Sequence, residues 1–186
     1  MRIGIFGGSF DPPHIGHLII AQESVIGLDL DKLCFMPLNR SKDKKPCAGP
    51  EERLDMLRMA IKGNEFFDID DREIKRGGIT YSIDSITEIK ATRANDELFF
   101  ILGTDALNSL PAWKNAKKLI KLVKFALYKR QGNYGIMPDI DIAYIDGPII
   151  DVSSSLIRER VKKGVSIRYI VPLEIEQYIY AKGLYK

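Results

Sequence analysis

Apolar residues alternate along the chain between short uninterrupted runs and longer segments in which they recur every three or four positions. Short runs bounded by turn residues are typical of buried strands, and the longer period is typical of amphipathic helices. The short runs predict strands at residues 2–6, 32–37, 66–70, 97–103, 124–130 and 140–145. The longer period predicts helices at 17–28, 50–63, 82–92, 115–123, 153–164 and 171–185, with a shorter helical segment ending at Leu110. Residues 72–82 are expected to be extended, and residues 39–49 to form a polar, lysine-rich loop.

Strands and helices alternate through the whole chain, without a repeat or a low-complexity linker. This order predicts one α/β domain, residues 1–186, in which right-handed βαβ units build a mostly parallel sheet with helices on both faces. Ligands bind such sheets at the carboxyl ends of the strands. The unusual stretches of the chain all follow predicted strands, at residues 7–17, 37–49, 103–113 and 147–154. We therefore expect these stretches to converge on one site.

Composition narrows the class of protein. A hydrophobic content of 45% and a charged content of 28% are typical of a folded, soluble domain. The net charge of +3 suits small anionic ligands, and it is too weak and too dispersed to indicate a nucleic-acid surface. Cys34 and Cys47 form no CxxC pair and are expected to be free thiols. With no signal peptide and no apolar run of about 20 residues, the chain is expected to be cytoplasmic and without membrane contact.

The first unusual stretch is GGSFDPPHIGH, residues 7–17, which contains both histidines of the chain, His14 and His17. It fits neither the dinucleotide pattern GxGxxG nor the phosphate-loop pattern GxxxxGK[ST]. A glycine turn between a strand and a helix start still presents backbone N–H groups to an anion. A helix beginning near His14 places both imidazoles on the same side, and Gly16 between them leaves room for a ligand to approach.

The two histidines have three interpretations. Two imidazole donors beside a bare turn suit a polyphosphate, whose charge grows on the leaving oxygens during displacement. The pair can instead be ordinary packing or surface residues. A zinc site needs about four ligands, and Cys34 and Cys47 have no metal-binding spacing with this pair, so no protein-bound metal is expected.

A second stretch, DVSSSLIRER at residues 151–160, begins a predicted helix with Ser153, Ser154 and Ser155. Serines at a helix start cap free N–H groups, so ordinary capping is one interpretation. Three serines exceed what one cap requires, and Arg158 lies one turn after Ser154. Arginine with hydroxyl and N–H donors at a helix start is typical of a phosphate site.

The order of GGSFDPPHxGH and then SSSxIR closely resembles the HxGH nucleotidyltransferase superfamily. The motifs FMP, RLDML, TYSIDS and FFILGTDALNSLPAW lie between them in the order of the nicotinate-nucleotide adenylyltransferase family, so the resemblance covers nearly the whole chain. It implies a Rossmann-like fold and adenylyl transfer from ATP to nicotinate mononucleotide, giving deamido-NAD and pyrophosphate. The reaction is expected to be a direct in-line attack without a covalent intermediate, with Mg²⁺ carried in on ATP.

The resemblance also implies which residues act, with His17, His14 and Arg158 as the catalytic set. The ATP site would comprise Gly7, Gly8, Ser9, Phe10, His14, Gly16, His17, Gly103, Asp105, Ser153, Ser154 and Arg158. The nicotinate mononucleotide site would comprise Ser9, Phe10, Lys44, Thr80, Tyr81, Ser82, Trp113 and Arg130. The expected partners are these two nucleotides, without nucleic acid or membrane, and a homo-oligomer is left open.

Within these sites, Trp113 is expected to stack on the electron-poor pyridinium, although a tryptophan after a proline is also often packed half-buried. Asp105 is expected to bind ribose hydroxyls, or else to cap the next helix. The family has PPHK after the second strand, where this chain has SKDKK at residues 41–45. Lys44 matches the family's lysine by register, but a solvated run of charge is the other interpretation. Arg130 is a weaker candidate for the mononucleotide phosphate.

Other nucleotidyltransferases share the HxGH turn. Trp113 and TYSID disfavour the pantetheine-phosphate adenylyltransferases and the cytidylyltransferases, whereas the choice between nicotinate and nicotinamide mononucleotide is left open. Class I aminoacyl-tRNA synthetases also contain a HIGH sequence, but this chain has no KMSKS motif and no room for a tRNA-binding domain. A nucleotide sensor without activity is a further alternative, and the complete set of His14, His17 and Arg158 counts against it.

Overall fold

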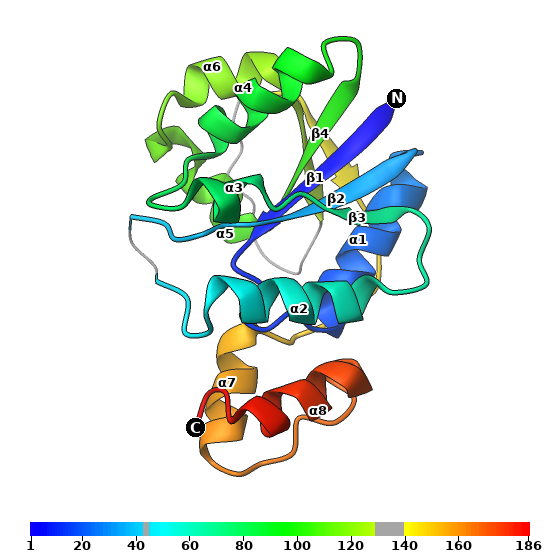
Figure 1. Ribbon diagram of the computed structural model, residues 1–186. Coiled ribbons are helices and arrows are strands. Elements are labelled where there is room, and N and C mark those ends of the chain that lie inside the picture. Colours follow the sequence, from blue (N-terminus) through cyan, green and yellow to red (C-terminus); the bar gives the residue numbers. More distant parts are fainter. Residues whose placement is uncertain (43–44, 129–139) are drawn as a thin grey trace.

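The computed structural model describes residues 1–42, 45–128 and 140–186 and shows a six-stranded, fully parallel sheet. The strands are β1 (Arg2–Gly8), β2 (Lys32–Pro37), β3 (Phe67–Ile69), β4 (Glu97–Leu102), β5 (Lys124–Tyr128) and β6 (Ile142–Ile145). The helices are α1 (Ile15–Gly27), α2 (Pro50–Ile61), α3 (Arg72–Arg76), α4 (Ser82–Thr92), α5 (Thr104–Ser109), α6 (Ala116–Leu122), α7 (Ser154–Lys162) and α8 (Leu173–Lys182), with a 3-10 turn, η1 (Leu110–Ala112). The strand order β3-β2-β1-β4-β5-β6 is that of a doubly wound Rossmann-like sheet, which confirms the predicted fold class (Figure 1).

Both faces of the sheet are covered, so successive side chains along a strand enter different cores. Ile3 and Ile5 of β1 pack with α4, α5 and α6, whereas Phe6 packs with α1 and α2 on the opposite face. In β4, Leu98 and Phe100 enter the first core and Phe99 and Ile101 enter the second. A strand that is buried on both faces has a continuous run of apolar residues in its sequence, and such runs allowed these strands to be predicted.

Helices α7 and α8 form a further layer beneath α2, away from the sheet (Figure 1). Ile157 and Val161 of α7 and Ile175 and Ile179 of α8 bury a small core against Met56 of α2. This layer brings the start of α7 to the loop that follows β1. Of the helices in residues 1–42, 45–128 and 140–186, none is long and apolar enough to span a membrane.

One predicted element is wrong. Residues 72–76 form the short helix α3, where an extended segment was expected. The backbone N–H of Lys75 donates to the carbonyl of Asp71, and that of Gly77 donates to Glu73, so the segment completes a helical turn. The turn ends at Gly77, whose φ of 70° is readily adopted by glycine. The side chain of Glu73 anchors this turn because it is buried and hydrogen-bonded to α4.

Candidate functional site

The site lies at the carboxyl edge of the sheet, between the neighbouring strands β1 and β4. The helix that follows β1 covers one face of the sheet, and the helix that follows β4 covers the other. A crevice outside the strand ends forms where successive connections diverge in this way, and open α/β sheets bind ligands there. The loops from residue 9 to residue 14 and from residue 103 onward both open at this point.

The loop after β1 is anchored by Phe10. This residue has a φ of 47° and a side chain only 1% exposed, and its ring lies edge-on to Phe6, Phe35 and His17. A Cβ added at Gly8 would lie 3.0 Å from the Phe10 ring. Any larger residue at position 8 would therefore press against the ring in its present position. Because the Phe10 side chain is buried in the core, any contact of this residue with a nucleotide is limited to its main chain.

His14 and His17 lie on one side of the start of α1, as the helical spacing predicted. Their rings are stacked with centroids 3.7 Å apart, and the backbone N–H of His14 donates to Nδ1 of His17 at 3.2 Å. A neutral imidazole that accepts at Nδ1 carries its proton on Nε2. Nε2 of His17 is therefore set as a hydrogen-bond donor, and the half-buried ring is held in place by Phe10 and His14.

The geometry gives Gly16 a further role, beside the expected one. A Cβ at this position would lie 3.1 Å from Cε1 and Nδ1 of His14. The glycine thus makes room for the imidazole of His14, which is 3% exposed, before it makes room for any ligand.

The start of α7 touches the histidine loop, as the two sequence motifs predicted. The Ser154 hydroxyl donates to the carbonyl of Pro12 at 2.8 Å, and Nη1 of Arg158 donates to the carbonyl of Asp11 at 2.6 Å. Ser153 caps α7, because its Oγ accepts from the N–H of Leu156 at 3.2 Å, so the capping interpretation is correct for that hydroxyl. The contacts join segments more than 140 residues apart in the sequence.

Two buried charges in this region were not predicted from the sequence. Asp11 is 2% exposed, and its carboxylate accepts from the backbone N–H groups of Cys47 and Ala48. Arg53 of α2 is fully buried and donates to the carbonyls of Ser9, Leu38 and Asn39, at 2.8, 2.7 and 3.1 Å. The sequence did carry a signal for Arg53, since it lies four residues before Leu57 and thus on the apolar side of the helix.

The loop after β4 begins with Gly103, which caps α5. Apart from its two chain neighbours, no described residue has a heavy atom within 4 Å of a Cβ built on Gly103. The hydroxyl of Thr104 is buried and has no hydrogen-bond partner among the described residues. Asp105 is the second residue of α5, and its side chain lies outside what the structure describes.

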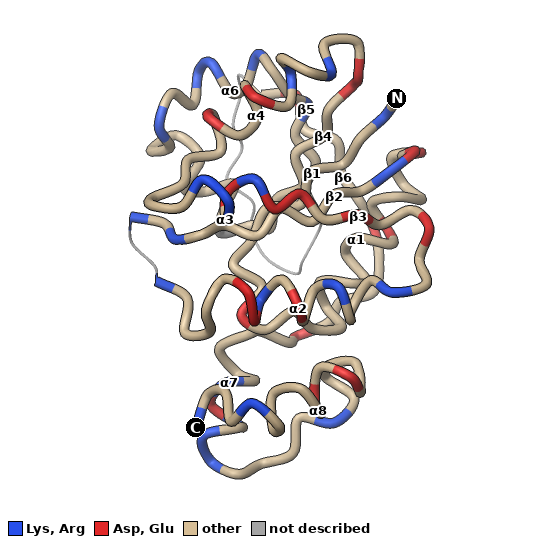
Figure 2. The backbone as a smooth tube through the Cα atoms, in the orientation of Figure 1, with Lys and Arg blue, Asp and Glu red and all other residues tan. Residues whose placement is uncertain are grey.

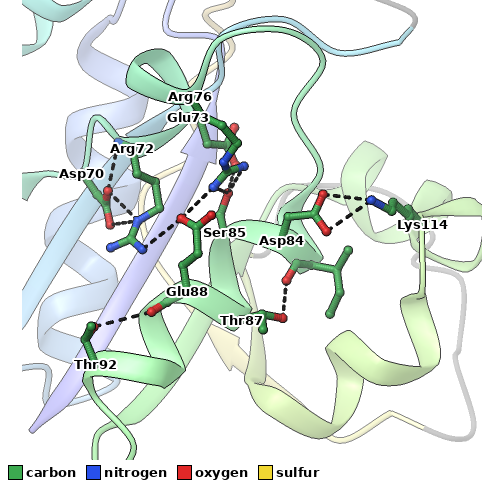
Figure 3. A network of polar contacts seen from close by, with 11 residues as sticks. Asp70, Arg72, Glu73, Arg76, Asp84, Ser85, Thr87, Glu88, Thr92 and Lys114 are labelled. Atoms are coloured by element: carbon green, nitrogen blue, oxygen red, sulfur yellow. Dashed lines mark hydrogen bonds and ion pairs between the residues drawn. The ribbon is translucent and has the colours of Figure 1, made fainter.

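The segment Thr80–Ser82 and the loop at Trp113 contact each other through Lys114. Tyr81 caps α4, and Lys114 lies with its Nζ 4.6 Å from the centre of the Tyr81 ring while pairing with Asp84 at 2.9 Å (Figure 3). Trp113 packs edge-on to Phe100, with centroids 6.0 Å apart, and its Nε1 donates to Ser109. The indole is half-buried, so packing accounts for part of its surface and leaves part accessible.

A network of polar contacts joins α3 to α4 (Figure 3). The hydroxyl of Ser85 donates to the carboxylate of Glu73 at 2.6 Å, and the guanidinium of Arg76 donates to Ser85 and to Glu88. Burial raises the pKa of Glu73, and the hydrogen bond from Ser85 opposes this shift. Thr80 is tied to the loop after β2, because its N–H and hydroxyl both donate to the carbonyl of Arg40.

A cleft of about 310 Å³ lies beside the contact between Thr80 and Arg40, and it is bounded by Asn39, Arg40, residues 45–50 and Gly78. The cations Arg40, Lys45 and Arg53 are among the residues that line it. Lys44 and Arg130, the two cations expected to meet the mononucleotide phosphate, lie outside the described residues.

Comparison with known proteins assigns this arrangement to a family. The cytidylyltransferase-like family model matches residues 5–160, a span that includes both motifs. The chain belongs to this family. The nicotinate-nucleotide adenylyltransferase of Bacillus subtilis is 36% identical to this chain, and the match covers all of this chain and 98% of that protein. A Halalkalibacterium halodurans protein named "Probable nicotinate-nucleotide adenylyltransferase" is 43% identical, and that match covers all of this chain and 91% of the relative.

Solved structures show the same fold in the family. The nicotinic acid mononucleotide adenylyltransferase of Plasmodium falciparum, complexed with NaAD, superposes with a TM-score of 0.79 at 22% identity. The match covers 99% of this chain and 97% of that one. Among the described residues of this family member, no group of three or more His, Cys, Asp or Glu side chains could hold a metal ion. Basic and acidic residues are interspersed along the chain (Figure 2).

Proposed function

We propose that the chain transfers the adenylyl group of ATP to nicotinate mononucleotide, giving deamido-NAD and pyrophosphate. The observation that carries the proposal is the contact between the histidine loop and the start of α7, through Ser154–Pro12 and Arg158–Asp11. This contact brings imidazole, guanidinium and helix N-terminal N–H donors together, and such a donor set suits the phosphates of a nucleoside triphosphate. The full-length relatives named as nicotinate-nucleotide adenylyltransferases support the choice of acceptor.

In the proposed reaction, a phosphate oxygen of nicotinate mononucleotide attacks the α-phosphorus of ATP in line with the leaving group. The new P–O bond forms as the bond from the α-phosphorus to the bridging oxygen breaks, and the electron pair leaves with pyrophosphate. Nε2–H of His17 donates to the oxygens on which charge grows, and Arg158 with the start of α7 holds the β- and γ-phosphates. Catalysis then consists of positioning and charge stabilisation, and no residue forms a covalent intermediate.

The mononucleotide would lie between Thr80–Ser82 and Trp113. The accessible part of the indole stacks on the pyridinium ring, and the main-chain N–H groups of Tyr81 and Ser82 bind the nicotinate carboxylate. Thr80 holds this segment in place, because its own N–H donates to the carbonyl of Arg40. Lys44 and Arg130 are proposed to bind the mononucleotide phosphate, near the cleft lined by Arg40 and Lys45. Asp105 is proposed to bind the adenosine ribose.

Magnesium enters this scheme as part of the substrate. Mg²⁺ keeps few protein ligands in phosphoryl-transfer sites and is held mainly by phosphate oxygens and water. The donors described around the histidine loop are mostly N–H and hydroxyl groups, and the Asp11 carboxylate already accepts three hydrogen bonds. This donor set fits a triphosphate that brings its own Mg²⁺, which neutralises charge on the phosphates.

The proposal is tested by an acceptor panel. Pyrophosphate release from MgATP would be followed with nicotinate mononucleotide, nicotinamide mononucleotide or pantetheine phosphate, and the adenylylated product identified by mass. Turnover that is highest with nicotinate mononucleotide is expected, and turnover with pantetheine phosphate alone would refute the proposal. Direct attack further predicts no exchange of labelled pyrophosphate into ATP when no acceptor is present.

A further inference from the structure

The carboxylate of Asp11 joins three segments of the chain. Beyond the N–H groups of Cys47 and Ala48, at 2.6 and 3.0 Å, it accepts a hydrogen bond from the hydroxyl of Tyr185 at 2.7 Å. A carboxylate that is 2% exposed needs such partners, because an unpaired buried charge is very costly. Where the loop after β1 lies therefore depends on the residues that hold Asp11.

Tyr185 reaches this loop from beyond α8, and the C-terminal segment lies beside α7 (Figure 1). Its φ of 63° is in the left-handed region, which a bulky residue adopts only when its surroundings hold it there. Burial, and then the neighbouring Asp11 carboxylate, raise the pKa of Tyr185, so its hydroxyl stays protonated as a donor. The contact spans 174 positions of sequence.

The other side of Asp11 holds Arg158. The main-chain carbonyl of Asp11 accepts from Nη1 of Arg158 at 2.6 Å, and its carboxylate lies 3.9 Å from the same nitrogen. Nη2 of Arg158 is fixed by Ser155 at 3.1 Å, so the plane of the guanidinium is set by two contacts. A shift of Asp11 would rotate this plane and displace His14, three residues further along.

From this arrangement we infer that Asp11 and Tyr185 are positioning residues for the proposed adenylyl transfer. The Tyr185 hydroxyl holds the Asp11 carboxylate, and Asp11 holds Arg158 and the start of α1 in the orientation that a triphosphate needs. The inference rests on the proposed function. Neither side chain contacts the nucleotide in this scheme, so both act through Arg158 and the loop.

The chain offers a matched pair of variants to test this. Tyr185→Phe removes the hydroxyl bonded to Asp11, whereas Tyr178→Phe removes a hydroxyl that donates to Asp55 of α2 at 3.1 Å, remote from the histidine loop. Both variants lose one tyrosine–carboxylate hydrogen bond from the same layer. We expect a small loss in thermal unfolding temperature for Tyr178→Phe and a larger one for Tyr185→Phe, because Asp11 is buried and the Asp55 side chain is 43% exposed. Only Tyr185→Phe should lower kcat, by about tenfold, as for a modest misplacement of catalytic groups.

Comparing the change in kcat with the change in KM distinguishes a positioning role from a purely structural one. For Tyr185→Phe, the KM for nicotinate mononucleotide should stay within about twofold of wild type, because that pocket lies across the crevice. Asp11→Asn, which keeps the shape and loses the charge, should lower kcat at least as much. Wild-type kcat in Tyr185→Phe, or an equal loss in Tyr178→Phe, would overturn the inference whatever happens to Asp11→Asn.

A double-mutant cycle with Arg158→Lys tests whether the effect passes through the guanidinium. If it does, Tyr185→Phe should cost less than about threefold once Arg158 has been replaced, because coupled residues are not additive. Full additivity would overturn this route. Wild-type turnover with nicotinate mononucleotide tests the proposed function separately. If the wild-type protein shows no turnover, the affinity for MgATP is measured by calorimetry for the same set of variants. The same non-additivity is then expected in the binding free energies.

Discussion

Arg53 allows the sharpest test of how the site is held together. Its guanidinium is fully buried and donates to the carbonyls of Ser9, Leu38 and Asn39, so one side chain ties the loop after β1 to the loop after β2. Replacement by methionine, Arg53→Met, keeps much of the volume and leaves three carbonyls without this donor. The loss should therefore be large for a single substitution.

The magnitude follows from the contacts. A hydrogen bond from a charged donor contributes about 1.5–3 kcal/mol, and a buried group left unsatisfied costs about 1–3 kcal/mol. Burial lowers the pKa of Arg53, with Asp11 opposing the shift, which shows that desolvation of the guanidinium offsets part of this gain. Three carbonyls lose a charged donor, and desolvation offsets part of the sum, so we expect Arg53→Met to lower the free energy of unfolding by about 3–5 kcal/mol.

Urea denaturation at constant pH measures this difference, and Arg58→Met provides the control. Arg58 lies in the same helix, and its side chain is 55% exposed and pairs with Asp55 at 2.9 Å. Such exposed pairs contribute about 0–1 kcal/mol. If Arg53→Met costs under about 1 kcal/mol, or no more than Arg58→Met, the carbonyls find other partners and the guanidinium does not hold the two loops.

Three further predictions concern single side chains. Trp113→Ala should weaken binding of nicotinate mononucleotide by about 1–3 kcal/mol, the range for loss of base stacking, and leave ATP binding nearly unchanged in calorimetry; equal losses for both ligands would make the indole purely structural. Burial raises the pKa of Cys34 to about 11, so iodoacetamide at pH 8 should alkylate exposed Cys47 well before Cys34. Peptide mass spectrometry measures this order, and the reverse order would contradict the fold. The raised pKa of Glu73 means that its charged form is less stable when folded, so its contribution is greatest in acid and falls as the pH rises through its folded pKa. Glu73→Gln should flatten the stability profile at pH values above the ordinary pKa of a glutamate, and an unchanged profile would contradict the raised pKa of Glu73.

The sequence predicted the sheet well because its strands are buried on both faces. Continuous runs such as ELFFIL of β4 have no other stable environment in a chain of this composition, and turn residues bound them clearly. The prediction for residues 72–76 was wrong because a single helical turn has too few residues to show a helical period. Its helical state depends on burial of Glu73 against Ser85, a contact that no local pattern reveals.

The meeting of the two motifs was also predictable, since parallel strands bring their following loops to one edge. The position of His14 and His17 on one side of the helix start followed from their spacing, whereas the stacking of their rings did not. The partners of Asp11 did not follow, because they lie 36, 37 and 174 positions away and include backbone N–H groups that any residue could supply. The roles of Lys44, Asp105 and Arg130 stay predictions of the sequence.

The most direct test of the account is a single-turnover measurement of adenylyl transfer at His17. His17→Asn can keep the amide oxygen near the position of Nδ1, where it caps His14, and removes the donor at Nε2. With MgATP and nicotinate mononucleotide bound, the rate of the chemical step should fall at least about 100-fold, as for loss of a preorganised donor, while affinity for ATP changes little. A fall under about tenfold, or a loss of ATP affinity as large as the loss of rate, would contradict a role for His17 in the transition state.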